Sequence, residues 1–393
     1  MDDYFHPAPL ACFLADMSCH MRSVIIKPVG SFCNLRCEYC FYLEKHQLYK
    51  GVPSTHKMPD DILEKLIRNM FSCTDNPTFV WHGGEPLLAG LNFFSKAVAL
   101  QKRYAEGRPY ANAMQTNGTL LDEDWAAFLR DEKFLVGISL DGPEHVHDRY
   151  RKDHKGNGTF QQVFDNCMML LSQGVQVNVL ATVNDYSVQF PFEIYTFFKQ
   201  NGLFFMQFNP VVESHPEDPT AAAPFSVGAL EYGKFLRRLF KIWVRDFDFT
   251  TLRQKTSIRF FDSLIQKYID MVPDQCIFQE KCGDALIVEH NGDLFSCDYL
   301  VSEDTHIGTL HEGSLRQAFN SSAHQTFSEK KADLPPKCLK CRWLKLCYGG
   351  CMKDRIRDPQ DKGMNRFCRS YQIFFREADQ QLKRFARLYK ENY

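Results

Sequence analysis

The sequence predicts an α/β protein: a partial (β/α)6 barrel, followed by a small cysteine-rich module with a β-hairpin and a C-terminal helix. Three observations support this prediction. Short apolar runs alternate with amphipathic helical patterns from residue 23 to about 212, cysteines crowd the chain after Cys276, and an amphipathic pattern covers Tyr371–Tyr389. Six consecutive β/α units favour a parallel sheet with right-handed crossovers, which at this length curls into a partial barrel.

The six strand-like runs are short, apolar and bounded by polar segments. They cover Ser23–Val29, Thr78–Trp81, Ala111–Gln115, Phe134–Leu140, Val175–Val183 and Phe204–Phe208. Helical patterns between them include Asp60–Met70, Phe93–Tyr104, Asp124–Arg130 and Thr159–Leu171. Ligands of such folds bind at the carboxyl ends of the strands, so we expect the site among the loops that follow them.

The later chain divides into further segments. Residues 213–225 are rich in Pro, Ala, Glu and Asp and are expected to form an exposed connection. Helical patterns follow over 226–245 and 256–271, and Asn291-Gly292 predicts a hairpin between Leu286–Glu289 and Leu294–Cys297. The expected organisation is an N-terminal extension (1–22), the barrel (23–235), a helical connection (236–272), the cysteine-rich module (273–370) and a C-terminal helix (371–393).

Composition excludes several classes of function. The 393 residues carry a formal net charge of −1, so the chain lacks the basic footprint of a nucleic-acid binder. No apolar run approaches the roughly 20 residues that span a membrane. The segment Leu10–Cys19 follows an acidic start and contains Asp16, which makes it a poor signal peptide. We therefore expect a cytoplasmic protein that binds neither nucleic acid nor membrane.

Cysteine is over-represented and clustered. The chain has 15 cysteines, and cytosolic thiols stay reduced, so metal or cluster ligation is favoured over disulfides. Cys33, Cys37 and Cys40 give a cubane iron–sulfur cluster only three thiolates for its four irons. The open iron could chelate the amino and carboxylate groups of a small molecule. A zinc knuckle is the alternative, although zinc sites favour four protein ligands.

The segment from Cys33 through Tyr42, Cys-Asn-Leu-Arg-Cys-Glu-Tyr-Cys-Phe-Tyr, resembles the signature of radical S-adenosylmethionine (SAM) enzymes. Gly83-Gly84-Glu85-Pro86 resembles their second motif, whose backbone holds the methionine amino group. The resemblance implies further SAM contacts. Tyr39 and Val212 would line the adenosine site, and Ser139 and Arg151 would contact the methionine and ribose portions. Taken alone, each of these residues has an ordinary structural alternative, such as a turn, a strand-end hydroxyl or a solvated cation.

Eight later cysteines resemble the SPASM extension of this superfamily, a module with two auxiliary 4Fe–4S clusters. The resemblance implies two interleaved ligand sets. The first would be Cys276, Cys282, Cys297 and Cys351, and the second Cys338, Cys341, Cys347 and Cys368. Complete sets of four suit electron transfer better than chelation of a substrate. A pair of zinc ribbons is the alternative that the spacing leaves open.

Whole segments are similar to anaerobic sulfatase-maturating enzymes. They are Gln115–Leu120, Phe134–Pro143 and Glu289–Asp298. The resemblance implies three 4Fe–4S clusters, SAM, and oxidation of a cysteine or serine side chain to Cα-formylglycine without oxygen. A SAM-derived radical would remove a hydrogen atom from Cβ, Asp298 would accept a proton, and an auxiliary cluster would take an electron. Taken alone, Asp298 could equally cap the hairpin end. Implied partners are an unfolded sulfatase and an electron donor such as flavodoxin or ferredoxin.

Two alternatives remain open at this point. The first is a radical SAM/SPASM peptide maturase that forms crosslinks in a ribosomally made peptide. Such enzymes often carry a leader-binding domain before the barrel, whereas residues 1–22 alone precede the first strand here. The second is a non-catalytic iron–sulfur or zinc scaffold, which has no use for a three-cysteine site. Residues 1–20 hold no motif, so we expect them to be dispensable. We expect Cys73 and Cys167 to be buried packing residues.

Overall fold

A curved, mostly parallel sheet forms the centre of the computed structural model, which describes residues 21–49, 57–215, 218, 221–248, 253–356 and 363–392. The strands follow the order β12-β11-β10-β1-β2-β3-β4-β5-β6-β9. The first six are β1 (Ser23–Ile26), β2 (Thr78–Trp81), β3 (Ala111–Thr116), β4 (Leu135–Ser139), β5 (Gln176–Val183) and β6 (Phe205–Pro210). All neighbours from β1 to β6 pair in parallel. Their carboxyl ends therefore lie along one rim of the barrel.

Alternating burial explains why these segments are strands. In β5, every second residue is buried, from Val177 to Val183, while the residues between them are only partly covered. Successive side chains of a strand point to opposite faces, so this period of two places one face of β5 against the core. The buried face belongs to one large apolar core cluster that continues through the helices.

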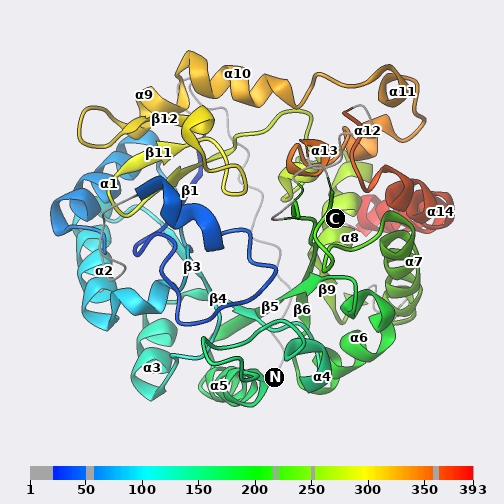
Figure 1. The fold of residues 1–393 in the computed structure, drawn as a ribbon, viewed down its shortest axis with the longest axis horizontal. Coiled ribbons are helices and arrows are strands. Elements are labelled where there is room, and N and C mark those ends of the chain that lie inside the picture. Colours follow the sequence, from blue (N-terminus) through cyan, green and yellow to red (C-terminus); the bar gives the residue numbers. More distant parts are fainter. Residues whose placement is uncertain are drawn as a thin grey trace.

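Amphipathic helices cover the outside of the curved sheet in chain order (Figure 1). They are α1 (Asp60–Cys73), α2 (Leu91–Ala105), α3 (Glu123–Asp131), α5 (Phe160–Ser172), α6 (Pro191–Gln200) and α7 (Ala229–Arg245), with the short α4 (Glu144–His147) between β4 and α5. Local signals fix several of their starts. Asp122 caps α3 by accepting a hydrogen bond from the backbone N–H of Trp125 at 2.9 Å. Pro191 occupies the first turn of α6, where no backbone donor is needed.

The C-terminal segment spans the side of the barrel that the six strands leave open (Figure 1). It contains β7 (Phe247–Asp248), β8 (Arg253–Gln254), β9 (Ser257–Ile258), α8 (Arg259–Tyr268), β10 (Ala285–Val288), β11 (Asp293–Phe295) and β12 (His306–Thr309). The helices α9 (Leu315–Phe319), α10 (Ser322–Lys330), α11 (Pro336–Leu339), α12 (Leu344–Cys347), α13 (Lys353–Ile356) and α14 (Cys368–Asn392) follow. Helix α14 packs on α7 and α8, with the ring of Phe374 stacked on that of Phe261.

The cysteine-rich module shares a sheet with the barrel. Strand β10 pairs in parallel with β1, and Ser23 is opposite Ala285 in the register. Strand β11 then forms the expected antiparallel hairpin with β10, and β12 pairs with β11. As a result, β1 lies between β10 and β2 as an interior strand of one continuous sheet. This pairing sets the cysteine loop after β1 beside the hairpin that carries Cys297.

The predicted α/β class is confirmed, and the six strands lie where the apolar runs predicted them. The expected division at residue 235 falls inside α7, and α14 begins at Cys368 rather than at Tyr371. The prediction that 213–225 is an exposed connection is wrong at its end, because Ala223 and Phe225 are buried against the cysteine loop. Cys73 and Cys167 are buried core residues, as expected.

The N-terminal extension, with Cys12 and Cys19, lies outside the described residues. In the described part of the chain, no helix has the length and apolar character needed to cross a membrane.

Candidate active site and cysteine clusters

The loop after β1 carries Cys33, Cys37 and Cys40 as free thiols. Burial raises the pKa of Cys33 to about 12 and that of Cys37 to about 11, and it also raises the pKa of Cys40. Cys37 and Cys40 each raise the pKa of Cys33 further, so the three thiols lie close enough to interact electrostatically. Buried thiols of this kind become thiolates when a metal centre compensates the charge.

Two further contacts fix this loop at the strand ends. The backbone N–H of Arg36 donates to the carbonyl of Lys152 at 2.8 Å, and the Asn117 amide donates to the sulfur of Cys33 at 3.7 Å. Asn117 follows β3, so the cysteine loop is held from a neighbouring strand as well as from its own.

Gly83, Gly84 and Glu85 follow β2 and press against the cysteine loop. The N–H groups of Gly84 and Glu85 donate to the carbonyls of Gly30 and Phe32, each at 2.8 Å. A Cβ atom on Gly84 would lie 1.9 Å from the Phe32 carbonyl oxygen, so only glycine permits this approach. The sequence motif is therefore needed to bring the two loops together.

The carboxylate of Glu85 is fully buried, and its hydrogen-bond donors come from the protein itself. It accepts hydrogen bonds from the N–H of Leu87, the hydroxyl of Thr116 and the N–H of Asn117, at 3.0, 2.7 and 2.7 Å. Burial raises its pKa to about 7, although these three donors act in the opposite direction. Glu85 thus joins the end of β2 to the end of β3.

Tyr39 and Arg151 meet at Asp141, which follows β4 and is fully buried. The Tyr39 hydroxyl donates to one carboxylate oxygen at 2.5 Å, and Arg151 Nε lies 3.1 Å from the other. The N–H of Thr182, in β5, donates to the same carboxylate at 2.8 Å. The guanidinium group of Arg151 also lies 5.5 Å from the centre of the Tyr39 ring. This network holds the cysteine loop against β4 and β5.

Ser139 and Val212 lie at the ends of β4 and β6. The hydroxyl of Ser139 accepts a hydrogen bond from the amide of Gln115 at 3.0 Å. Val212 is fully buried, and its carbonyl oxygen lies 3.4 Å from Lys353 Nζ. Both residues therefore lie on the same rim as the cysteine loop, although the side chain of Val212 packs into the core.

Asp298 follows Cys297 and forms an ion pair with the fully buried Lys27 of the β1 end. Lys27 Nζ also lies 3.4 Å from His82 Nδ1, at the end of β2. Burial acts to raise the pKa of Asp298, but the positive charge of Lys27, together with His82, outweighs it and holds the pKa below its ordinary value. Burial and Lys27 lower the pKa of His82 to about 4. Asp298 is therefore an ionised carboxylate at the mouth of the barrel.

The structure brings the later cysteines together as two sets. Cys276 and Cys282 both raise the pKa of Cys297, after the effect of burial, and Cys297 and Cys276 raise that of Cys351. These four come from the segment before β10, the hairpin and the start of the α13 region. They are the residues that the resemblance groups as the first auxiliary set.

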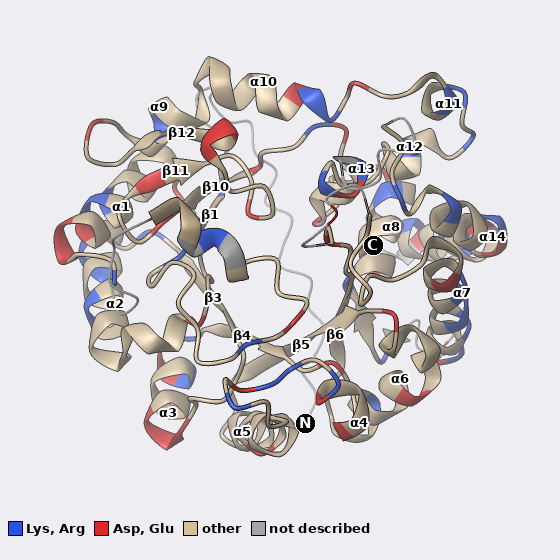
Figure 2. Cartoon of the chain, in the orientation of Figure 1, with Lys and Arg blue, Asp and Glu red and all other residues tan. Residues whose placement is uncertain are grey.

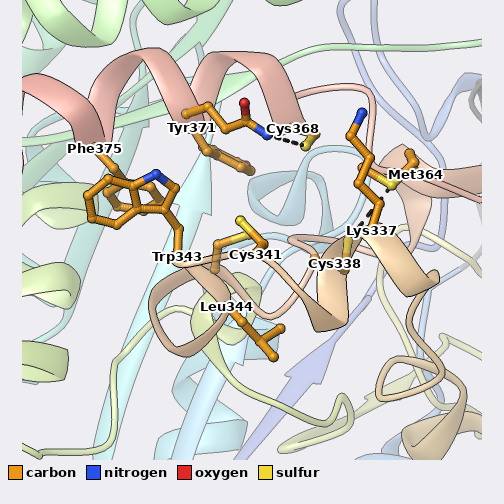
Figure 3. Close-up of a pocket in the computed structure, with 12 residues that line it drawn as sticks. Lys337, Cys338, Cys341, Trp343, Leu344, Met364, Cys368, Tyr371 and Phe375 are labelled. Carbon is orange, nitrogen blue, oxygen red and sulfur yellow. Dashed lines mark hydrogen bonds between the residues drawn. The ribbon is translucent and has the colours of Figure 1, made fainter.

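The second set lines a small cavity between α11, α12 and the start of α14 (Figure 3). Its four cysteines are Cys338, Cys341, Cys347 and Cys368. In Figure 3 the sulfur atoms of Cys338, Cys341 and Cys368 surround the same space, with Trp343, Tyr371 and Phe375 on one side. The amide of Gln372 donates to the sulfur of Cys368 at 3.4 Å.

These donor sets fit iron–sulfur clusters. Each of the eleven cysteines is free, and they form one set of three and two sets of four. Among the described residues, no group of three or more His, Cys, Asp or Glu side chains is arranged to hold a single metal ion. A cubane distributes its thiolates over separate iron atoms and so requires a wider spacing than one ion does.

Several residues of this rim were missed by reasoning from the sequence. From the sequence, Asp141 has no role beyond its place in the segment Phe134–Pro143, yet three neighbours meet at its carboxylate. Lys27 was treated as part of a strand. A lone cation inside the apolar run Ser23–Val29 was the available signal, because buried lysines need a partner. For Asp141 no local pattern distinguishes a buried carboxylate from an exposed turn residue.

Comparison with known proteins agrees with this geometry. Residues 28–187 match the model of the Radical SAM superfamily, and residues 276–342 match an iron–sulfur cluster-binding domain named SPASM. The chain is 38% identical over 373 residues to the serine-type anaerobic sulfatase-maturating enzyme of Bacteroides thetaiotaomicron, covering 90% of this chain and 89% of that protein. It is 34% identical over 362 residues to the cysteine-type enzyme of Clostridium perfringens, covering 91% and 96%.

Solved structures give the same result. The structure of "native anSMEcpe with bound AdoMet and Cp18Cys peptide" is 33% identical, with a TM-score of 0.84 and coverage of 93% of this chain and 98% of that one. The structure of Streptococcus suis SuiB bound to the precursor peptide SuiA has a TM-score of 0.57 at 13% identity and covers 86% and 73%. The second likeness shows the fold alone.

Proposed function

The chain belongs to the anaerobic sulfatase-maturating enzymes, a family of radical SAM oxidoreductases, and from this premise we propose that it oxidises a cysteine or serine side chain of a sulfatase to Cα-formylglycine. The relatives include both serine-type and cysteine-type enzymes. The proposal therefore covers both target residues. The substrate is a protein or peptide, and we propose an unfolded sulfatase.

The observation that carries the proposal is the position of Asp298. It is a partly buried carboxylate, with 16% of its side chain exposed, that follows a cysteine of the first auxiliary set and pairs with the buried Lys27, at the end of the strand that leads into the three-cysteine loop. Forming an aldehyde from a –CH2–OH or –CH2–SH group removes a hydrogen atom, a proton and an electron. A carboxylate near both cysteine sites is well placed to accept that proton.

When bound, a cluster on Cys33, Cys37 and Cys40 would supply the electron for reductive cleavage of SAM, and SAM would supply the acceptor for the hydrogen atom. The chain's own residues position the reactants. Tyr39 and Arg151, held by Asp141, and Ser139 form the part of the rim that we assign to SAM, together with Gly83 and Gly84 after β2. Val212 borders the same region from the end of β6. Asp298 lies toward the auxiliary clusters and takes the proton.

We assign the cluster ligands by the grouping described above. Cys33, Cys37 and Cys40 hold the cluster that meets SAM, and the two sets of four hold the auxiliary clusters. Complete ligation by four cysteines leaves no iron open to substrate. Auxiliary clusters held by these two sets would therefore accept and transfer electrons rather than bind the substrate.

We further propose a cytoplasmic protein served by flavodoxin or ferredoxin as electron donor. The free thiols fit a reducing compartment. Exposed cations on the segment around the second cysteine set, Lys337, Lys340 and Lys345, would attract an acidic electron carrier (Figure 2).

The test replaces Asp298 by Asn, which keeps the shape of the side chain but removes its basicity. Anaerobically reconstituted Asp298→Asn protein is incubated with SAM and a sulfatase-derived peptide bearing Cys-x-Pro-x-Arg or Ser-x-Pro-x-Arg. We expect 5′-deoxyadenosine to form while formylglycine falls by about two orders of magnitude, the lower end of the range for loss of a general base. Mass spectrometry of the peptide measures the product directly.

The matched control is Asp304→Asn, the same chemical change at an exposed position on the same module. It should leave both products unchanged. If Asp298→Asn forms formylglycine at the wild-type rate, Asp298 is not the base and only caps the end of the hairpin. If the wild-type enzyme leaves every such peptide unmodified while cleaving SAM, the substrate assignment fails and the crosslinking of a ribosomal peptide becomes the function to test.

A further inference from the structure

Two cations are buried inside the cysteine-rich module. Lys331 ends α10 and is fully buried, and Arg355 lies in α13 and is 9% exposed. The two are also in contact, because Arg355 Nη1 donates to the carbonyl of Lys331 at 2.8 Å.

Within the described chain, their hydrogen bonds go to backbone carbonyls. Lys331 Nζ donates to the carbonyls of Cys276 and Gln279. Arg355 donates to the carbonyls of Asp333, Tyr348 and Gly349, besides that of Lys331, at distances between 2.8 and 3.4 Å. Carbonyl dipoles satisfy the donors but do not neutralise the charges. Burying an ion without a counter-charge is costly, so a source of negative charge is expected beside both groups.

The cysteine sets are that source, and the two cations face them differently. Lys331 Nζ donates to the carbonyl of Cys276, a member of the first set. Burial lowers the pKa of Lys331, and Cys282, Cys276 and Cys351, all of the first set, act to raise it. Arg355 donates to the carbonyls of Tyr348 and Gly349, which lie in the chain between Cys347 of the second set and Cys351 of the first. Burial likewise lowers the pKa of Arg355, and cysteines of both sets act to raise it. Lys331 therefore lies beside one site, whereas Arg355 lies between the two.

We infer that Lys331 and Arg355 set the reduction potentials of the auxiliary clusters, Lys331 acting on the first cluster alone and Arg355 on both. A cluster with four thiolate ligands carries one more negative charge when reduced than when oxidised. A fixed cation beside it therefore stabilises the reduced form more and raises the potential. The charges make these clusters better acceptors of the single electron that leaves the substrate after the hydrogen atom and the proton.

This inference concerns the clusters and does not depend on which protein is the substrate. It follows from the asymmetry between the two cations. Loss of the lysine charge should move one potential, and loss of the arginine charge should move two. The three-cysteine cluster should keep its potential in both variants, which provides an internal control.

The experiment is an anaerobic redox titration of the fully reconstituted protein, followed by electron paramagnetic resonance. Lys331→Met removes one charge and Arg355→Gln the other, and Lys330→Met, the same change at the exposed neighbouring residue, is the matched surface control. We expect Lys331→Met to lower one midpoint and Arg355→Gln to lower two. Each shift should reach about tenfold in the oxidised-to-reduced equilibrium, ~59 mV for a one-electron couple. Lys330→Met should move none.

Midpoints that stay in place in both buried variants, with the clusters assembled, would overturn the inference. If a variant fails to assemble its clusters, Lys331→Arg and Arg355→Lys decide the question by keeping the charge. Restored iron content with wild-type midpoints would support a role for the charge. If the charge-keeping variants also lose iron, the shape of the two side chains matters and not their charge, and the inference is wrong.

Discussion

Replacing Gly84 by Ala tests how the two rim loops hold each other. The new Cβ would lie 1.9 Å from the Phe32 carbonyl oxygen, whereas real Cβ contacts stay beyond 3.0 Å. The backbone at Phe32, directly before Cys33, must therefore retreat by about 1 Å. The hydrogen bonds from the N–H groups of Gly84 and Glu85 lengthen or break as a result.

The expected cost has two parts. Overpacking in a well-packed region costs about 1–3 kcal/mol, and the clash here is with rigid backbone. Each lost hydrogen bond adds about 1 kcal/mol. Gly84→Ala should therefore destabilise the fold by about 3–5 kcal/mol, and it should displace Cys33 from its two partner thiols.

The measurements are urea unfolding of the cluster-free protein under reducing conditions, and iron content with SAM cleavage after reconstitution. We expect a lower unfolding midpoint and loss of about four irons with loss of cleavage. Gly313→Ala is the control, because its Cβ would meet neighbours only at 3.4 Å and beyond, which is ordinary contact. An unchanged midpoint with full SAM cleavage in Gly84→Ala would refute the close approach of the loops.

The other predictions concern the clusters and the buried glutamate. Reconstituted wild-type protein should bind about twelve irons, because three cubanes hold four each. Replacing Cys33, Cys37 and Cys40 by Ala should remove about four of these irons. Stoichiometric zinc with little iron would contradict this prediction. Burial raises the Glu85 pKa from 4.5 to about 7, so its contribution to stability is full below pH 4.5 and declines as the pH rises through 7. The stability of wild type relative to Glu85→Gln should fall between pH 5 and 8 by at most about 3 kcal/mol, measured by urea unfolding of cluster-free protein; a pH-independent difference would show that burial does not perturb Glu85.

The sequence was sufficient for the strands and for the cysteine loop because both are local patterns. Alternation fixed β5, and the spacing of Cys33, Cys37 and Cys40 after an apolar run fixed the first loop. Helix α6 was not predicted. Its residues are rich in aromatic side chains, which are weak helix formers, and packing of Ile194 and Phe198 in the core holds it instead.

The remaining parts of the site depend on contacts between distant segments. Asp141 gathers Tyr39 and Arg151 only after β4 has been placed beside the cysteine loop. Nothing near Lys331 or Arg355 in the sequence distinguishes them from exposed cations, since their burial depends on how the module closes on itself. The role of Asp298 is a prediction that the Asp298→Asn variant tests, and the assignment of Tyr39, Ser139, Arg151 and Val212 to SAM is a prediction from the resemblance.

The pairing of β1 with β10 also has a consequence for the order in which the protein is made. Ser23 leaves the ribosome long before Ala285, its partner in the sheet. At about 5–20 residues per second, synthesis of the intervening chain takes on the order of 10–50 s. During that interval one edge of β1 has no native neighbour, and open strand edges can pair with other chains. The loop that will carry the first cluster therefore gains its final support late, so cluster insertion before the C-terminal third has emerged would act on an incomplete site.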